Sequence, residues 1–324
     1  MPAPDIGPKQ HAEALAAIIG RFGDRARNIK FPSDDLPAWH LYLTDNRQAF
    51  VTPDGQRVID EWAPVERVMG FLFDLHAHLL TGETGERVAG FVSLGGVFMV
   101  ITGLVLWWPA RRKFSLSNMW PRGKTRRKMI RWHRDLGIVF TPLLLVLLLT
   151  GSGMIFYQTT MAILNGLFGA PPPQQALPPA RAAAGIMPVT ADDIARVQSE
   201  FPDARLVFYA PPRRGDTSGA GLHVFRLKQP CEIHPNGRTY VHLSPQGRAV
   251  VQTTDACAAA GGQKAQNLLY PLHAGKIGSL LYKWLVFVGG LALAALAMSG
   301  IWAYARKLTR GERRRRVQAD AAPF

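Results

Sequence analysis

Three long apolar segments without a charged residue dominate the pattern of hydrophobic and polar positions. They are Val88–Trp108, Leu136–Tyr157 and Leu285–Ala303. A helix needs roughly 20 residues to cross a hydrocarbon layer of about 30 Å. The pattern therefore predicts an α-helical membrane protein with three visible transmembrane helices, whose chemistry has to be read with the bilayer as solvent.

Two other segments show the alternation that is typical of small α+β domains. In the first, helical spacing over Pro8–Phe22 is followed by runs rich in β-branched and aromatic residues, at Asn28–Phe31, Trp39–Thr44, Ala49–Thr52 and Arg57–Ile59. In the second, a helix over Ala191–Phe201, capped by Thr190, is followed by runs at Arg205–Tyr209, Leu222–Leu227, Thr239–Leu243 and Ala249–Thr253. The shared order predicts two copies of one domain.

The same turn signature marks a hairpin in each copy. A proline is followed two positions later by a glycine, at Pro53–Gly55 in the first copy and at Pro245–Gly247 in the second. This spacing is typical of a tight turn between two strands.

The net charge of +15 is concentrated beside the apolar segments. Pro109–Asp135 contains ten Lys or Arg and one acid, and Tyr304–Phe324 contains seven Lys or Arg and two acids, so 9 + 5 = 14 of the 15 charges lie there. Basic residues beside a span mark the cytoplasmic side of a membrane. We therefore read the charge as a topology signal, with contact to anionic lipids, and exclude nucleic acid as a partner.

This orientation places the N-terminal segment and the segment between the second and third spans outside. The segment Met1–Arg21 contains no apolar core of the kind found in signal peptides. Either a further span precedes this chain or the N-terminal segment crosses unaided, and the first explanation is the expectation here.

The two cysteines, Cys231 and Cys257, both lie in the outer part of the chain. An oxidising compartment allows them to form a disulfide. Their spacing in the sequence does not decide the matter, so two free thiols remain open as the alternative.

The spans carry a repeated motif of their own. Leu75-His76 precedes the first span and Thr102-Gly103 lies near its far end, whereas Leu272-His273 precedes the third span and Ser299-Gly300 lies near its far end. The separation from histidine to glycine is therefore identical in the two spans. The middle span has a related version, in which His133 precedes Thr150-Gly151.

The matched motifs predict that His76 and His273 lie at the same depth near the outer face. Two imidazoles facing each other across a bundle can hold a haem iron from both sides. The alternative is that both are interfacial polar residues that form structural hydrogen bonds. His78 is expected to point to a different face of its helix, where it could contact the cofactor's propionates or support the ligand.

His133 is the candidate ligand near the inner face, and its second ligand would have to come from outside this chain. Lys128, Arg131 and Arg134 could pair with haem propionates, or they could be basic residues that reach the headgroups. Trp107 and Trp302 could stack on a cofactor, although interfacial belts account for them equally well. The outer histidines His223, His234 and His242 could bind a metal or a substrate, but isolated strand histidines more often do neither.

Taken together, these motifs resemble the PepSY-associated transmembrane family. The resemblance is carried by Leu75-His76-x-x-Leu79-Leu80-x-Gly82, by Trp132-His133-Arg134-x-Leu136-Gly137, by Leu272-His273-x-Gly275-x-x-Gly278 and by the two Pro-x-Gly hairpins. It implies two periplasmic PepSY domains and, in some members, haem-containing inner-membrane reductases of ferric siderophores. Members typically have four spans, so this chain, which starts at the first PepSY domain, departs from the family pattern.

The expected organisation follows from these observations. The segments are a first PepSY-like domain (residues 1–74), a span with an outer histidine (75–109), a basic cytoplasmic loop (110–135), a span with an inner histidine (136–158), a Pro-rich linker (159–184), a second PepSY-like domain (185–260), a span with an outer histidine (270–305) and a basic tail (306–324).

Two functions of different classes remain at this point. In the first, the chain is a multi-pass inner-membrane protein that binds haem b and transfers electrons to a periplasmic ferric chelate, such as a ferric siderophore, for iron uptake. Its outer haem would be held by His76 and His273 and an inner haem partly by His133, and its electrons would come from quinol or a cytoplasmic partner. In the second, the chain is a non-enzymatic membrane module that binds or regulates a periplasmic protease or another partner.

Overall fold

The computed structural model describes residues 7–120, 123, 125–172, 188–212, 221–244 and 249–320, with side chains up to residue 307. The chain divides into two compact units. The first consists of Met1–Glu86 and Tyr157–Pro271, and the second of Arg87–Phe156 and Leu272–Phe324.

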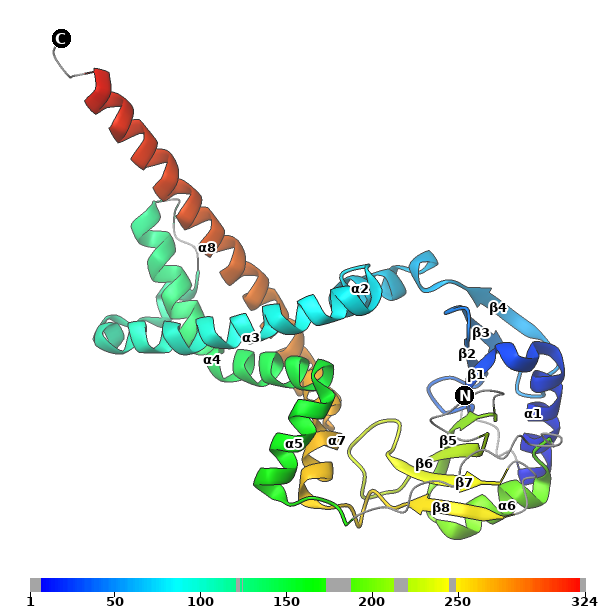
Figure 1. Cartoon of the computed structure of the whole chain (residues 1–324). Coiled ribbons are helices and arrows are strands. Elements are labelled where there is room, and N and C mark those ends of the chain that lie inside the picture. Colours follow the sequence, from blue (N-terminus) through cyan, green and yellow to red (C-terminus); the bar gives the residue numbers. More distant parts are fainter. Residues whose placement is uncertain are drawn as a thin grey trace. The chain divides into compact units, whose positions relative to one another are not determined.

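An antiparallel sheet of eight strands forms the centre of the first unit (Figure 1). Its order is β4-β3-β2-β1-β5-β6-β7-β8. The strands are β1 (Ala26–Lys30), β2 (Trp39–Leu43), β3 (Gln48–Val51), β4 (Val58–Trp62), β5 (Arg205–Ala210), β6 (His223–Lys228), β7 (Thr239–Leu243) and β8 (Val250–Thr254). Every strand lies where a β-branched or aromatic run predicts one.

The two sequence repeats share this sheet. Each supplies four consecutive strands, and the two sets meet where β1 pairs antiparallel with β5, with Lys30 opposite Phe208. The helices α1 (Pro8–Phe22) and α6 (Ala191–Glu200) pack against each other. A common hydrophobic core joins these helices to the alternate inward residues of the strands, and Trp39 and Phe225 are its largest fully buried members. Burial of this shared core is the main force that holds the repeats together.

The first hairpin shows why its glycine is needed. Gly55 has φ of 76°, which favours glycine, and its N–H donates to Thr52 O at 2.8 Å. A Cβ at this position would lie 2.5 Å from Ala14 O of α1. The turn therefore packs directly on the helix. The matching prediction at Pro245–Gly247 falls outside the described residues.

Three more α-helices belong wholly or largely to the first unit. They are α2 (Val68–His78), α5 (Tyr157–Phe168) and α7 (Gly261–His273). Helix α5 occupies residues that were expected to begin the linker, because its sequence is apolar and free of proline up to Phe168. The described residues also form short 3₁₀ turns at Gly23–Arg25, Pro64–Glu66, Trp108–Lys113 and Leu116–Met119.

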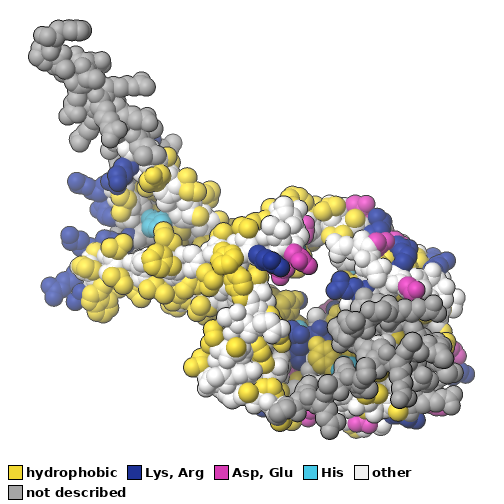
Figure 2. All heavy atoms as spheres, viewed as in Figure 1, with side chains coloured by type: hydrophobic (Ala, Val, Ile, Leu, Met, Phe, Trp, Pro, Cys, Tyr) yellow, Lys and Arg dark blue, Asp and Glu magenta, His cyan; other side chains and the backbone are white. Residues whose placement is uncertain are grey.

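The second unit contains the long helices α3 (Gly82–Trp107), α4 (Arg126–Ile155) and α8 (Leu280–Asp320). Among the described residues, three stretches are long and apolar enough to cross a membrane, Gly82–Lys113, Arg126–Ile155 and Leu280–Lys307, so the three expected spans are confirmed. Hydrophobic side chains cover much of their outer surface, with Lys and Arg gathered near one end (Figure 2). This surface suits contact with lipid.

The histidine motifs lie just before two of these helices rather than within them. After His78, Leu79 and Leu80 have positive φ, and Gly82 with φ of 62° starts α3. After His273, Gly275 and Gly278 have φ of 68° and 92°, and α8 starts two positions later. The expected spans 75–109 and 270–305 are therefore each divided by a break, because left-handed residues cannot continue an α-helix.

Candidate functional site

Two histidines of the second unit each meet a hydroxyl–glycine pair on a neighbouring helix. His133, near the start of α4, contacts Ser299 of α8, whereas Thr150, near the end of α4, contacts His273, just before α8. The two helices therefore run antiparallel. We call the His133 end the basic end, because Arg306 and Lys307 follow the apolar part of α8 there.

The hydrogen bonds of His133 define where its ring carries a proton. His133 Nδ1 lies 2.7 Å from Ser299 Oγ, and that hydroxyl donates its own proton to Leu296 O at 2.8 Å. Because a hydroxyl has only one proton, Ser299 accepts from His133, and the ring is protonated at Nδ1. The lone pair of the neutral ring is then on Nε2, which is the atom that can bind a metal.

The same reasoning holds at the opposite end. His273 Nδ1 lies 3.0 Å from Leu147 O and 3.2 Å from Thr150 Oγ1. A carbonyl can only accept, and the Thr150 hydroxyl donates to Val146 O at 2.6 Å. His273 therefore also has its proton on Nδ1 and its lone pair on Nε2.

Gly151 leaves the space that the His273 ring occupies against α4. A Cβ on Gly151 would be 3.0 Å from His273 Cε1, which is tighter than ordinary contact. A Cβ on Gly300 would be 4.0 Å from His133 Cε1, which is an ordinary contact, so the His133 ring does not require this glycine. Each imidazole ring therefore packs beside a hydroxyl–glycine pair of the partner helix. The comparison of the three span sequences did not predict this contact. The available signal was the opposite direction of the middle span, which brings His133 to Ser299-Gly300 and Thr150-Gly151 to His273.

His133 and His273 belong to separate sites. Their contacts on α4 lie at positions 133 and 150, which corresponds to about 25 Å of helix at a rise of about 1.5 Å per residue. One metal ion cannot bridge that distance. The two histidines therefore lie at different depths of the helix pair.

His76 and His78 both lie in the last turn of α2, in the first unit. His78 Nδ1 is 2.9 Å from the Asp74 carboxylate, four positions earlier. A carboxylate that accepts from Nδ1 leaves Nε2 available, as in many metal-binding histidines. His78 thus has the same tautomer as His133 and His273, with the proton on Nδ1. The sequence repeat, in contrast, aligns His76 with His273.

A buried carboxylate fastens the loop at the basic end. Asp135 has no exposed surface and accepts from Asn118 Nδ2 at 2.7 Å, Ser115 N at 3.3 Å and Arg134 Nε at 2.5 Å. Arg134 also donates to Lys113 O. This arginine is therefore engaged with the loop, which leaves Lys128 and Arg131 as the predicted propionate contacts at that end.

The third helix joins the pair through close contacts to α4. Ser93 Oγ of α3 donates to Leu148 O at 2.8 Å, and a Cβ on Gly96 would meet the Leu148 side chain at 2.9 Å. Small residues at helix interfaces allow such approach in membranes. Of the two tryptophans considered for stacking on a cofactor, Trp302 is covered by Arg306 at 4.7 Å.

The outer histidines have contacts within the sheet unit. His223 is buried and bonded to Tyr209 OH at 2.8 Å, and burial raises the pKa of that tyrosine. His234 Nδ1 accepts from Asn236 N at 3.2 Å, so its proton is on Nε2, opposite to the ligand-type tautomer. Burial lowers the pKa of His242. Within the described ranges, no three His, Cys, Asp or Glu side chains converge on a metal position.

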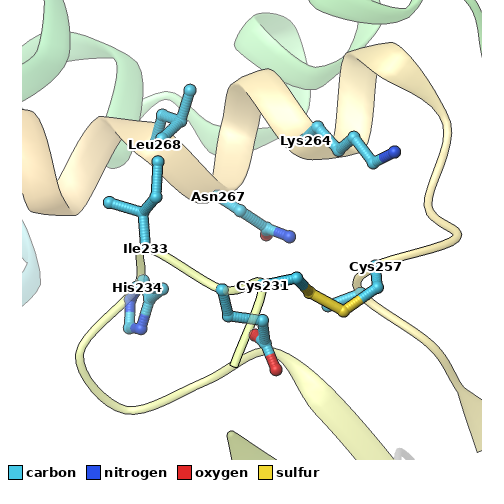
Figure 3. Close-up of a pocket in the computed structure, with 9 residues that line it drawn as sticks. Cys231, Ile233, His234, Cys257, Lys264, Asn267 and Leu268 are labelled. Carbon is cyan, nitrogen blue, oxygen red and sulfur yellow. A yellow bond between two sulfur atoms is a disulfide. The ribbon is translucent and has the colours of Figure 1, made fainter. Parts of the chain in front are cut away.

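A hollow of about 330 Å³ lies beside α7 in the first unit (Figure 3). Lys264, Asn267 and Leu268 of α7 form one wall, and the loop after β6, with His234, forms the other. No sequence motif predicted this hollow, because its two walls come from segments that are well separated along the chain.

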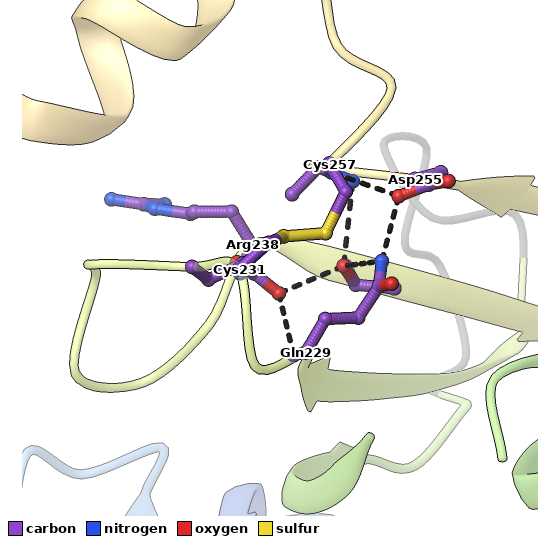
Figure 4. Close-up of a disulfide and its surroundings, with 8 residues drawn as sticks. Gln229, Cys231, Arg238, Asp255 and Cys257 are labelled. Carbon is purple, nitrogen blue, oxygen red and sulfur yellow. Dashed lines mark hydrogen bonds between the residues drawn. A yellow bond between two sulfur atoms is a disulfide. The ribbon is translucent and has the colours of Figure 1, made fainter. Parts of the chain in front are cut away.

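The floor of this hollow is a disulfide between Cys231 and Cys257 (Figure 4). Asp255 Oδ1 accepts from Gln229 Nε2 at 2.6 Å and from Cys257 N at 2.8 Å. The bond and these contacts connect the β6–β7 loop to the segment that leads into α7. A disulfide is in keeping with an oxidising compartment on this side of the chain.

The rings of His133 and His273 fit haem iron as axial ligands. A haem iron needs no more than two protein ligands, so two imidazoles at separate sites do not have to converge with other side chains. Each has a bonded Nδ1–H and a lone pair on Nε2, and each lies among apolar helices. These are the features that hold and tune an axial histidine.

Comparison with known proteins identifies one family. The family model described as PepSY-associated TM region matches residues 4–307. No curated protein matches the sequence.

Proposed function

The chain belongs to the PepSY-associated TM region family, and from that premise we propose that it is a haem b protein of a bacterial inner membrane that passes electrons to a periplasmic ferric chelate. A bound haem would supply the one-electron carrier. The acceptor Fe³⁺ gains one electron and becomes Fe²⁺, which oxygen-rich chelators hold far less tightly. Iron would thereby be released for uptake.

The observation that supports this proposal most strongly is that two imidazole rings, one at each end of a helix pair, have the same tautomer. His133 and His273 lie at opposite ends of one antiparallel helix pair, and both have the proton on Nδ1. A purely structural histidine needs no particular tautomer at both ends of a membrane helix. An electron carrier needs a ligand near each face, so that charge can cross a layer of about 30 Å.

Each residue has a distinct role in this proposal. His273 would hold the outer haem, with His76 as the second ligand proposed from the equal motif spacing, and His133 would hold an inner haem. Thr150, Leu147 O and Ser299 keep the ring protons on Nδ1. Quinol or a cytoplasmic partner would donate the electrons.

Absorbance spectroscopy of the purified full chain tests the proposal. We expect a Soret band, loss of part of it in His273→Ala and in His133→Ala, and no change in the control His242→Gln, which replaces a histidine of the sheet. On mixing the reduced protein with a ferric chelate, Fe²⁺ should be captured by ferrozine. Protein expressed with ample haem that shows no Soret band would contradict the proposal and favour the non-enzymatic module.

The second ligand of the outer haem is decided by two further variants. The sequence repeat favours His76, whereas the Asp74 contact gives His78 a suitable ring orientation. We expect His76→Ala to lose the outer haem and His78→Ala to retain it. Loss only in His78→Ala would move the ligand by two positions and leave the proposed function intact.

A further inference from the structure

The eight-stranded sheet has two unlike faces. One face packs on α1 and α6 and forms the hydrophobic core. The other face presents partly exposed side chains that alternate with the core residues along each strand. These side chains are mainly aromatic rings, histidines and cations, which is unusual for the solvent side of a sheet, where small polar residues would suffice.

A single cross-strand row runs over this second face. The pairing registers place six residues side by side, one each from β3, β2, β1, β5, β6 and β7, namely Phe50, His40, Lys30, Phe208, Arg226 and Tyr240. We call these six residues the aromatic–cation row. Neighbouring strands are about 4.8 Å apart, so the row offers a ring or a cation at each such step.

The centre of the row lies where the two sequence repeats join. Phe208 has Lys30 Nζ at 5.9 Å from its ring centre on one side and Arg226 Cζ at 5.7 Å on the other. Tyr42 lies next to it, with ring centres 6.1 Å apart. The join between β1 and β5 thus brings a cation from each repeat to the same ring, and neither repeat has this cluster alone.

The row continues outward in both repeats. In the first, His40 and Phe50 have ring centres 4.8 Å apart, and Arg67 lies over the neighbouring Trp62 at 3.5 Å. In the second, Arg226 lies 5.7 Å from the Tyr240 ring.

Positive charge predominates along this face. Lys30, Arg67 and Arg226 contribute three positive charges, while Asp60, which pairs with Arg67, and Glu232, whose charge acts on Arg226, contribute two negative charges. Arg226 is held in place by two bonds to Gly237 O and also faces Glu232 across the loop. The pKa of His40 is lowered, chiefly by burial and also by the charges of Lys30 and Arg67. Of these causes, only the charges of Lys30 and Arg67 favour an anion.

We propose that the aromatic–cation row binds an anionic chelate that carries aromatic rings, of the ferric tris-catecholate type. The rings of such a ligand can stack on Phe208 and Tyr240, while its negative charge meets Lys30 and Arg226. A neutral aliphatic chelate gains neither contact. The identification of the ligand as an iron chelate rests on the proposed function, whereas its charge and aromatic character follow from the row itself.

The competing explanation is that these pairs only stabilise the sheet. Cross-strand aromatic pairs stabilise a sheet, and a cation over an aromatic ring also contributes to folding. That role predicts an effect of substitutions on thermal stability and none on ligand affinity. The two explanations therefore differ in what they expect of a binding measurement on folded variants.

The test measures, by calorimetry, the binding of the gallium complex of a synthetic hexadentate tris-catecholamide to the purified full chain. Gallium is not reduced, so binding is measured apart from electron transfer. We expect binding of this trianionic complex and at least tenfold weaker binding of the gallium complex of desferrioxamine B, which is cationic and has no aromatic rings. Equal binding of both complexes, or binding of neither, would overturn the proposal.

Variants place the site on the sheet. We expect Phe208→Leu and the pair Lys30→Gln with Arg226→Gln to weaken binding by fivefold or more, while Lys9→Gln on α1, which covers the other face, leaves affinity unchanged. Circular dichroism checks that each variant is folded. Unchanged affinity in folded variants would refute the binding site and leave the proposal of a haem protein intact. Absence of haem together with normal binding of the gallium complex would refute only the proposed function.

Discussion

The proton on Nδ1 is the most informative single-atom feature of the histidines in the helix pair. It follows from acceptors that have no proton to give, namely Leu147 O for His273 and a Ser299 hydroxyl that is already donating for His133. Such acceptors hold the ring orientation as well as the tautomer. Their removal should therefore affect a bound metal even though they never touch it.

Ser299→Ala should weaken haem retention at the basic end. The substitution removes the acceptor of His133 Nδ1–H, and loss of such a supporting contact typically costs about 10–100-fold in metal affinity. The measurement is the rate of haem transfer from the purified protein to apomyoglobin. Ser152→Ala is the matched control, because Ser152 is also buried and its hydroxyl, among the described residues, bonds within its own helix to Leu149 O. Equal transfer rates in both variants would contradict the assigned role.

At the scale of elements, the helix pair depends on the space that its glycines leave. Gly151 meets the His273 ring closely, whereas Gly290 of α8 has no atom within 4 Å of where a Cβ would be, among the residues that the structure describes. The two positions therefore predict opposite outcomes for the same substitution.

Gly151→Ala should displace the His273 ring and lower the haem content of the outer site by half or more. The added methyl would lie 3.0 Å from His273 Cε1, and the ring is held by backbone on the other side. Gly290→Ala should leave haem content unchanged and raise helix stability slightly, by up to about 1 kcal/mol. Pyridine haemochrome assays on both variants check this, and a loss in Gly290→Ala alone would contradict it.

The disulfide should stabilise the first unit. Its two cysteines have a sequence separation of 26, and closing a loop of that size is expected to contribute about 3.5 kcal/mol by restricting the unfolded chain. The double variant Cys231→Ser with Cys257→Ser should therefore show a lower thermal midpoint, followed by circular dichroism. Addition of dithiothreitol should lower the midpoint of the unmodified protein and leave that of the double variant unchanged. If neither the double substitution nor dithiothreitol lowered the thermal midpoint, the disulfide would not be stabilising.

The sequence predicted the elements of this fold better than their assembly. Strands such as β2 and β7 could be recognised because alternation exposes which side chains face a core, and Thr190 could be recognised as a helix cap, which its contact with Asp193 N confirms. The join of β1 to β5 could not, because pairing of edge strands depends on backbone groups that carry no sequence signal. The contacts of His133 with Ser299 and of His273 with Thr150 could not be predicted either, because they join residues that are far apart in the sequence.

At the scale of the whole molecule, acid should destabilise the sheet unit. The pKa values of His11, His40 and His242 are all lowered from 6.5, chiefly by burial. Below pH 6.5 the unfolded chain therefore binds more protons than the folded one, and stability falls until the folded pKa values are passed. We expect a lower thermal midpoint at pH 5.5 than at pH 7.5, and little change between pH 7.5 and 8.5. A midpoint that rises on acidification would contradict the sign.

The proposed direction of electron transfer depends on the orientation of the chain in the membrane, which labelling can test. The loop between α3 and α4 lies in a segment with ten Lys or Arg and one acid, so it should be cytoplasmic, and α1 should be periplasmic. In intact spheroplasts, a membrane-impermeant maleimide should label Gly20→Cys, on the exposed side of α1, and should label Ser117→Cys only after permeabilisation. The native Cys231 and Cys257 do not react with the maleimide, because they form a disulfide with each other. The opposite labelling pattern would put His273 at the cytoplasmic face, and a periplasmic chelate could then no longer be the acceptor at that end.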